Sequence, residues 1–152
     1  MSSRLFQQIR EDRGLAYSVY SYHSSFKHEG IFAIYAGTAS EHVETVLKLT
    51  LDIIHQIRSN GIAEEELRKA REQIKGNLML SLESTNSRMS RLGRNELLLG
   101  KHWSLDELLE KLNRVTLAEV HEVAQAVFRD TPAVATVGEE EPLSKLRQAL
   151  GT

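Results

Sequence analysis

The sequence contains no cysteine, which excludes disulfide bonds, thiol catalysis and thiolate metal sites. Only 2 prolines and 9 glycines occur among 152 residues, so we do not expect a long flexible linker. Positive charge is not in excess, because 19 Lys and Arg residues stand against 21 Asp and Glu residues. Nucleic-acid binding driven by counterion release is therefore not expected.

Long apolar runs are also missing. The most apolar stretch, residues 46–57, is interrupted by Lys48, Asp52 and His55, whereas a membrane span needs roughly 18 uninterrupted apolar residues. No apolar signal segment follows the first residues. We expect no membrane partner, and the lack of cysteine fits a cytoplasmic location.

The composition that is present, 41% hydrophobic and 26% charged, is typical of a globular protein. The length predicts a single domain over residues 1–152. Hydrophobic periodicity predicts helices over residues 3–12, 41–59, 63–83, 87–99, 104–115, 116–128 and 142–150, and strands over residues 16–26, 31–36 and 133–138. This order predicts an α+β fold in which an antiparallel or mixed sheet packs against several helices.

Local signals support several of these elements. Two capping boxes, Ser104 to Glu107 and Thr116 to Glu119, mark helix starts. The first two strands, joined by a short turn that ends at Gly30, form a predicted antiparallel hairpin. The second strand is nearly all apolar, and we expect it to be buried on both faces.

The six histidines are candidates for a metal site. They are His23, His28, His42, His55, His102 and His121. A helical zinc site needs two histidines three or four residues apart on one face with a carboxylate nearby. No two of these histidines share a predicted helix at that spacing, so we expect no metal bound by this chain.

Three arginines, Arg88, Arg91 and Arg94, recur every three residues along one predicted helix. Such a row can bind phosphates or an acidic peptide. A solvated helix face is the favoured interpretation, given Glu96 nearby and the net negative charge.

Arg10 and Tyr17 form the remaining candidate constellation. Arg10 ends the first predicted helix, the chain reverses at Gly14, and Tyr17 lies at the start of a strand. A guanidinium and a phenol brought together in this way offer two donors and no base, which is typical of a carbonyl binder or an oxyanion stabiliser. From the residues alone, the favoured interpretation is that the Arg10 side chain is solvated and the Tyr17 side chain packs in the protein.

Several separated motifs occur in an order that resembles a known family. They are the segments 2–6, 9–11, 14–19, 76–78, 82–84 and 88–91, beginning with Ser-Ser-Arg-Leu-Phe and Gly-Leu-Ala-Tyr-Ser-Val. Together they resemble the second module of the insulinase (pitrilysin) family, in the branch of bacterial relatives of mitochondrial processing peptidase. The resemblance extends over essentially all 152 residues.

The resemblance implies a zinc metalloendopeptidase built from two similar α+β modules that face each other across a chamber. In that family the first module carries zinc on an H-x-x-E-H motif, and the second supplies an Arg and a Tyr seven residues apart. Arg10 and Tyr17 match this pair and are implied to bind and polarise the scissile carbonyl of a peptide or unfolded polypeptide. Because H-x-x-E-H is absent from this sequence, zinc is expected on a first module, and this chain alone is expected to be inactive.

Two further expectations follow from the resemblance. The family module starts with a strand and a helix that this sequence does not contain, so we expect a truncated second module. The sheet edge left open by the missing strand is expected to pair with a second copy, so that the fragment forms a homodimer or aggregates. The alternative to a peptidase is a non-catalytic structural core subunit of the same family.

Overall fold

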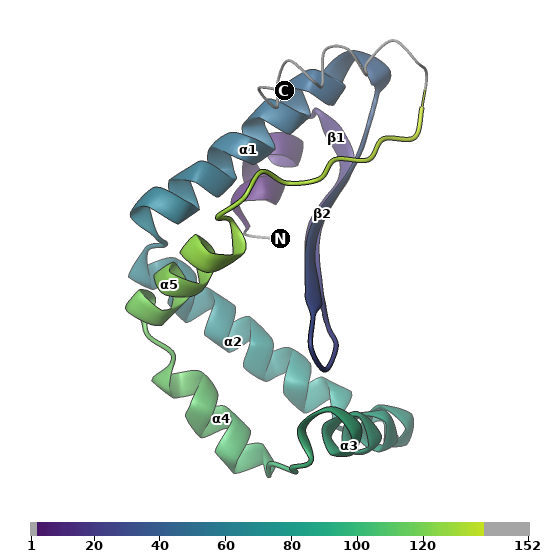
Figure 1. Cartoon of the computed structure of the whole chain (residues 1–152), viewed down its shortest axis with the longest axis vertical. Helices are drawn as coiled ribbons and strands as arrows, with labels where there is room; N and C mark the ends of the chain where they lie inside the picture. Colours follow the sequence, from purple (N-terminus) through teal and green to yellow (C-terminus); the bar gives the residue numbers. More distant parts are fainter. Residues whose placement is uncertain (1–2, 139–152) are drawn as a thin grey trace. The chain divides into compact units, whose positions relative to one another are not determined.

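The computed structural model describes residues 3–138. The elements in chain order are the π-helical turn η1 (Phe6–Glu11), the strands β1 (Ala16–Ser25) and β2 (Gly30–Thr38), the short helix η2 (Ser40–His42), and the helices α1 (Val43–Asn60), α2 (Glu64–Ser81), α3 (Thr85–Leu99), α4 (Leu105–Arg114) and α5 (Leu117–Val127) (Figure 1). The fold is α+β, as predicted. The described residues divide into two compact units, one of 3–25, 29–60 and 123–138 and the other of 26–28 and 61–122.

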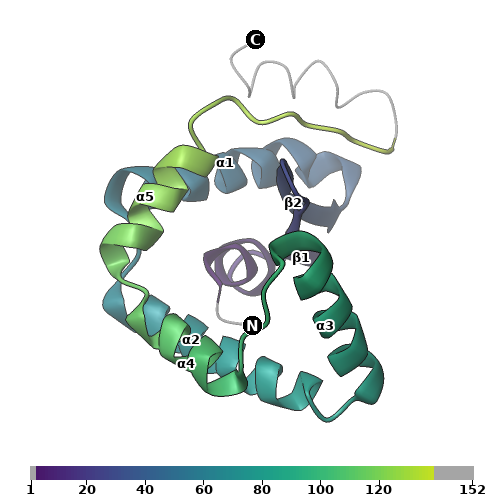
Figure 2. The same ribbon diagram turned by 60° about the horizontal axis from the view of Figure 1, so that its bottom comes forward.

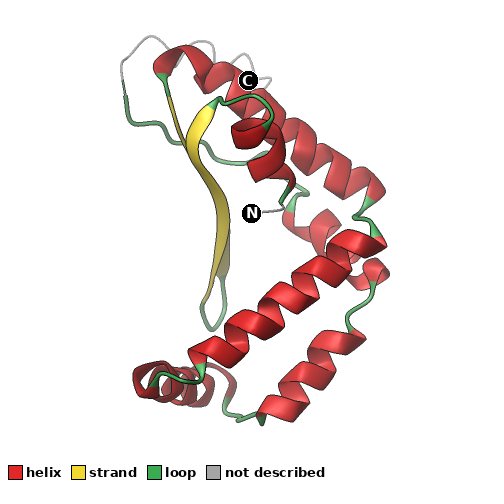
Figure 3. Cartoon of the chain, turned by 180° about the vertical axis from the view of Figure 1, so that it is seen from behind, coloured by secondary structure: helices red, strands yellow, loops and turns green. Residues whose placement is uncertain are grey.

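In the first unit, β1 and β2 form a long antiparallel hairpin, seen in yellow in Figure 3. Its register places Tyr20 opposite Tyr35 and Val19 opposite Ala36. Side chains alternate between the two faces of a strand. One face therefore carries Val19, which is buried, and the other carries the two tyrosines, which are about half exposed.

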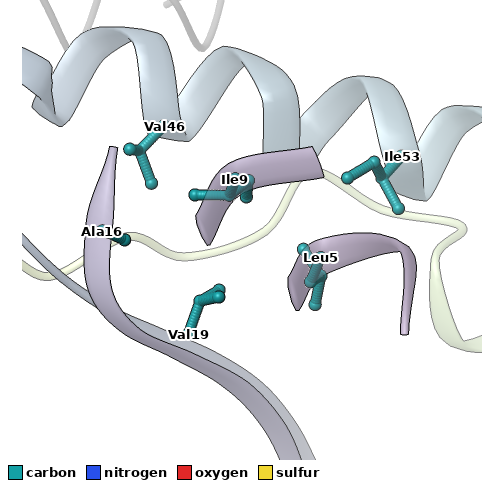
Figure 4. Close-up of a cluster of buried hydrophobic side chains, with 6 residues drawn as sticks. All are labelled: Leu5, Ile9, Ala16, Val19, Val46 and Ile53. Carbon is teal, nitrogen blue, oxygen red and sulfur yellow. The ribbon is translucent and has the colours of Figure 1, made fainter. Parts of the chain in front are cut away.

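The core of this unit joins η1, β1 and α1 (Figure 4). Its buried members are Leu5, Ile9, Ala16, Val19, Val46 and Ile53. The residues from α1 recur at helical spacing, and the apolar stripe of that helix faces the hairpin and η1. The core thus packs directly beneath the turn between η1 and β1.

In the second unit, α2 and α4 lie side by side (Figure 2). The Arg71 guanidinium on α2 donates a hydrogen bond to the carbonyl of Val115, just after α4. Arg91 on α3 donates a 3.0 Å hydrogen bond to the carbonyl of Trp103. The helices of this unit are therefore joined by arginine side chains that satisfy backbone carbonyls at helix boundaries.

Both predicted capping boxes are confirmed. The Ser104 amide donates to the Glu107 carboxylate at 2.7 Å, and the Glu107 amide donates to the Ser104 hydroxyl at 3.2 Å. The corresponding reciprocal pair joins Thr116 and Glu119 at 2.7 and 3.2 Å. These bonds satisfy backbone donors that have no partner within the helix.

Two details of the predicted sheet are wrong. Residues 133–138 form no strand; Val134 and Val137 are exposed there, and the sheet of the described residues contains only β1 and β2. A β-rich composition favours an extended chain, but a strand also requires a partner for its backbone groups. Strand β2 is not buried on both faces, because Ile31 and Tyr35 are exposed. The predicted helix 142–150 lies outside the described residues.

No helix within residues 3–138 is both long enough and apolar enough to cross a lipid bilayer.

Candidate functional site

Arg10 lies in the last turn of η1, on the exposed side of the element. Its guanidinium lies over the ring of Phe6, 5.0 Å from the ring centroid. A guanidinium stacked in this way keeps its N–H donors in the plane of the group, where they can reach a carbonyl or carboxylate. The π-helical winding of this turn is uncommon and is frequent at functional sites.

The turn that follows η1 is closed by backbone hydrogen bonds around Gly14. The Gly14 amide donates to the Arg10 carbonyl at 3.0 Å, and the Leu15 amide donates to the Ile9 carbonyl at 2.9 Å. Gly14 has a φ of 61°, the left-handed conformation that favours glycine at a helix end. Arg13 adds a side-chain bond of 2.8 Å to the carbonyl of Gln8. The turn is therefore fixed mainly by main-chain geometry.

Tyr17 occupies a β-bulge at the start of β1. Ala16 pairs with Thr38 and Ser18 pairs with Gly37, so Tyr17 is an extra residue on its strand. The bulge explains why Ala16 and Val19 are both buried although they are three positions apart. Tyr17 itself is 89% exposed, the result expected when a bulge redirects a side chain away from the core.

Each candidate residue directly follows a buried one. Ile9 is 0% exposed and precedes Arg10, and Ala16 is 5% exposed and precedes Tyr17. Both buried residues belong to the same core cluster (Figure 4). Packing of this core therefore holds the backbone of Arg10 and Tyr17 in place while both side chains remain at the surface.

The chemistry available at this site is hydrogen-bond donation. The Arg10 guanidinium carries a fixed positive charge with several donors, and the Tyr17 phenol is a neutral donor. Of the nearby acids, Asp12 accepts a hydrogen bond from the Gln7 side-chain amide at 3.2 Å, within the turn. Donors of these two kinds can bind a carbonyl or stabilise a developing oxyanion, but they provide neither nucleophile nor base.

The histidines and acids within the described residues do not form the donor set of a zinc site. Among residues 3–138, no group of three or more His, Asp or Glu side chains is placed to hold a metal ion. His102 lies 2.8 Å from the Glu96 carboxylate, and His42 lies 3.4 Å from the Glu41 carboxylate. A histidine with a single carboxylate lacks the donor number that zinc requires.

The arginine row of α3 is divided between two environments. Arg91 is partly buried and satisfies the Trp103 carbonyl, whereas Arg88 and Arg94 are exposed. A solvated face was the favoured interpretation for all three, so the tertiary bond of Arg91 is a correction. Arg91 joins α3 to the segment that precedes α4.

Three further tyrosines, which the sequence pattern did not single out, lie on the surface of the hairpin. Tyr20, Tyr22 and Tyr35 are each about half exposed. The sequence pattern predicted only that they lie in strands. The available signal was compositional: together with Tyr17 they are all 4 tyrosines of the chain.

Comparison with known proteins shows which family this chain resembles. The family model described as the peptidase M16 inactive domain matches residues 1–74. This match confirms the resemblance that the sequence motifs indicated.

Individual relatives agree with this assignment. A Bacillus subtilis protein named uncharacterized zinc protease YmxG is 50% identical over 137 residues, which cover 90% of this chain and 34% of the relative. The solved peptidase M16 inactive domain from Pseudomonas fluorescens has a TM-score of 0.71 at 26% identity, and the match covers 82% of this chain and 29% of that one.

A second similar solved structure is a chain of a larger complex. A chain of complex III2 from Candida albicans has a TM-score of 0.74 at 25% identity, over 83% of this chain and 30% of that one. The present chain spans about a third of the length of the curated relatives it matches.

Proposed function

We propose that this chain is the substrate-binding part of a zinc-dependent metalloendopeptidase of the processing-peptidase type, located in the cytoplasm. A first module would carry the zinc, which supplies the hydrolytic chemistry when bound, and this chain would bind the peptide or unfolded polypeptide. The observation that carries the proposal is the placement of Arg10 and Tyr17. Both side chains are exposed, one at each end of a turn that backbone hydrogen bonds close. Each of the two residues directly follows a buried residue.

In this proposal the two side chains act on the peptide carbonyl. Arg10 binds and orients the peptide backbone through charge-assisted hydrogen bonds. The Tyr17 hydroxyl donates to the carbonyl oxygen and binds more strongly as negative charge develops there. Such donors accelerate the reaction because they are fixed before it begins. A core-anchored turn and a β-bulge provide that fixation.

The direct test is Tyr17→Phe in the complete protein that contains this chain. Losing one oxyanion donor is expected to lower kcat on a peptide substrate by about 100-fold. The control is Ser21→Ala, which removes a hydroxyl from the core-side face of the same strand and is expected to leave turnover unchanged. Unchanged turnover for Tyr17→Phe, with folding confirmed by circular dichroism, would remove Tyr17 from the mechanism.

A structural core subunit is the second candidate function. It is supported by the likeness to a chain of complex III2 from Candida albicans, with a TM-score of 0.74. The two candidates differ in metal content and activity. Zinc analysis of the purified complete protein, together with a peptide-cleavage assay, distinguishes them, because a structural subunit is expected to show no cleavage.

A further inference from the structure

The face of the hairpin that points away from the core is lined by tyrosines. Tyr20 lies between two others, with ring centroids 5.1 Å from Tyr35 on β2 and 6.2 Å from Tyr22 on β1. Tyr20, Tyr22 and Tyr35 are 50%, 50% and 48% exposed. We call these three side chains the tyrosine face.

This face carries no charged residue along the two strands. The positions that alternate with the core side on β1 are Ser18, Tyr20, Tyr22 and Ser24, and their partners on β2 are Gly37, Tyr35, Ala33 and Ile31. Tyrosine combines an apolar ring with a polar hydroxyl and is enriched at binding surfaces that are partly exposed to water. The composition therefore suits uncharged, aromatic or apolar side chains.

The tyrosine face lies on the same strand as Tyr17 of the candidate site. Tyr17 precedes Tyr20 by three residues on the same strand, at the bulge. Tyr20 and Tyr22 are two residues apart, and an extended peptide repeats its side chains at the same spacing of about 6.6–6.8 Å. A peptide bound at Tyr17 and running over this face along β1 would thus present every second side chain to the tyrosines.

We propose that the tyrosine face determines substrate preference, by binding aromatic or apolar side chains at alternate positions of an extended peptide. This inference rests on the proposed function, because it takes the peptide to be bound at Arg10 and Tyr17. Ring-to-ring contacts of this kind are strong enough to favour one substrate over another and weak enough to allow its release.

The test uses the complete protein and two fluorescent peptides that differ only in phenylalanine or serine at alternate positions. Binding is measured by fluorescence anisotropy and cleavage by chromatography. Tyr22→Ser is expected to weaken binding of the phenylalanine peptide about 5-fold and to leave the serine peptide unchanged. Tyr22→Phe keeps the ring and is expected to retain the preference. The matched control is His23→Ser, which changes the next residue on the opposite face.

The outcomes separate the inference from the proposed function. If the complete protein cleaves peptide and Tyr22→Ser does not change its peptide preference, the inference about the tyrosine face is wrong. The proposed function is then unaffected. Selective binding that depends on Tyr22 without any cleavage would support the face and contradict the peptidase. A loss of self-association in Tyr22→Ser, measured by light scattering, would assign the face to a second copy and overturn the inference.

Discussion

The amide of Leu15 donates a 2.9 Å hydrogen bond to the carbonyl of Ile9, so the end of η1 and the approach to β1 are joined at one turn. Ile9 is also fully buried in the core that contains Ala16. This backbone hydrogen bond and the shared core therefore fix the main chain at Arg10 and Tyr17, which directly follow Ile9 and Ala16.

Gly14→Ala is expected to destabilise the protein by about 1–2 kcal/mol, because a φ of 61° is strained for any residue with a Cβ atom. No heavy atom lies within 4 Å of the added Cβ, so conformation alone causes the loss. Gly76→Ala, inside α2 and equally open, is expected to stabilise by about 0.5–1 kcal/mol. Urea denaturation measures both, and equal effects would contradict the prediction.

Arg10→Lys is expected to lower kcat/KM on a peptide substrate by about 10-fold or more, because an ammonium cannot reproduce the planar donor set of a guanidinium. Arg13→Lys is the control. Its guanidinium donates to the carbonyl of Gln8 inside the turn, and we expect a change in stability without comparable loss of activity. Steady-state kinetics on the complete protein decides the matter, and equal activity losses in both variants would count against a direct role for Arg10.

Acid is expected to destabilise the start of α4. Hydrogen bonds from the Ser104 backbone and side chain lower the pKa of Glu107 below its ordinary value of 4.5. A carboxyl with a lowered pKa in the folded state stabilises above its unfolded pKa, and this contribution is lost as pH falls through the folded pKa. Stability should therefore decline with acidification below about 4.5.

The single tryptophan, Trp103, reports this change because it directly precedes the capping box, and the Lys111 ammonium lies 5.0 Å from its ring centroid. In Glu107→Gln, the acid-dependent fluorescence change in that pH range is expected to disappear. Glu119→Gln removes the equivalent carboxylate at α5 and serves as the control. An identical acid transition in all three proteins would show that Glu107 is not responsible.

We also predict that the isolated chain self-associates through an open sheet edge. Within residues 3–138 the sheet has two strands, so each has an edge that no other strand there pairs. Exposed backbone donors and acceptors favour pairing with a second copy. Light scattering over a concentration series should show a rising apparent mass. A constant monomer mass across the series would be the contrary result.

The sequence by itself determined most of the local structure. Capping residues such as Ser104 and Thr116 specify their helix starts through short-range hydrogen bonds, and the first hairpin follows from β-branched and aromatic residues around a glycine turn. The family resemblance indicated Arg10 and Tyr17 as candidate site residues, and their role stays a prediction. These features depend on interactions within a few residues, or on motifs that are visible in the sequence.

Only the tertiary structure decided which side chains are exposed and which segments pair as strands of the sheet. Residues 133–138 have strand composition, yet no described strand pairs with them. The π-helical turn at Arg10 and the bulge at Tyr17 arise because a shared core must bury both Ile9 and Ala16 while the chain reverses between them. Burial of these residues depends on contacts among η1, β1 and α1. No local sequence pattern could therefore have revealed it.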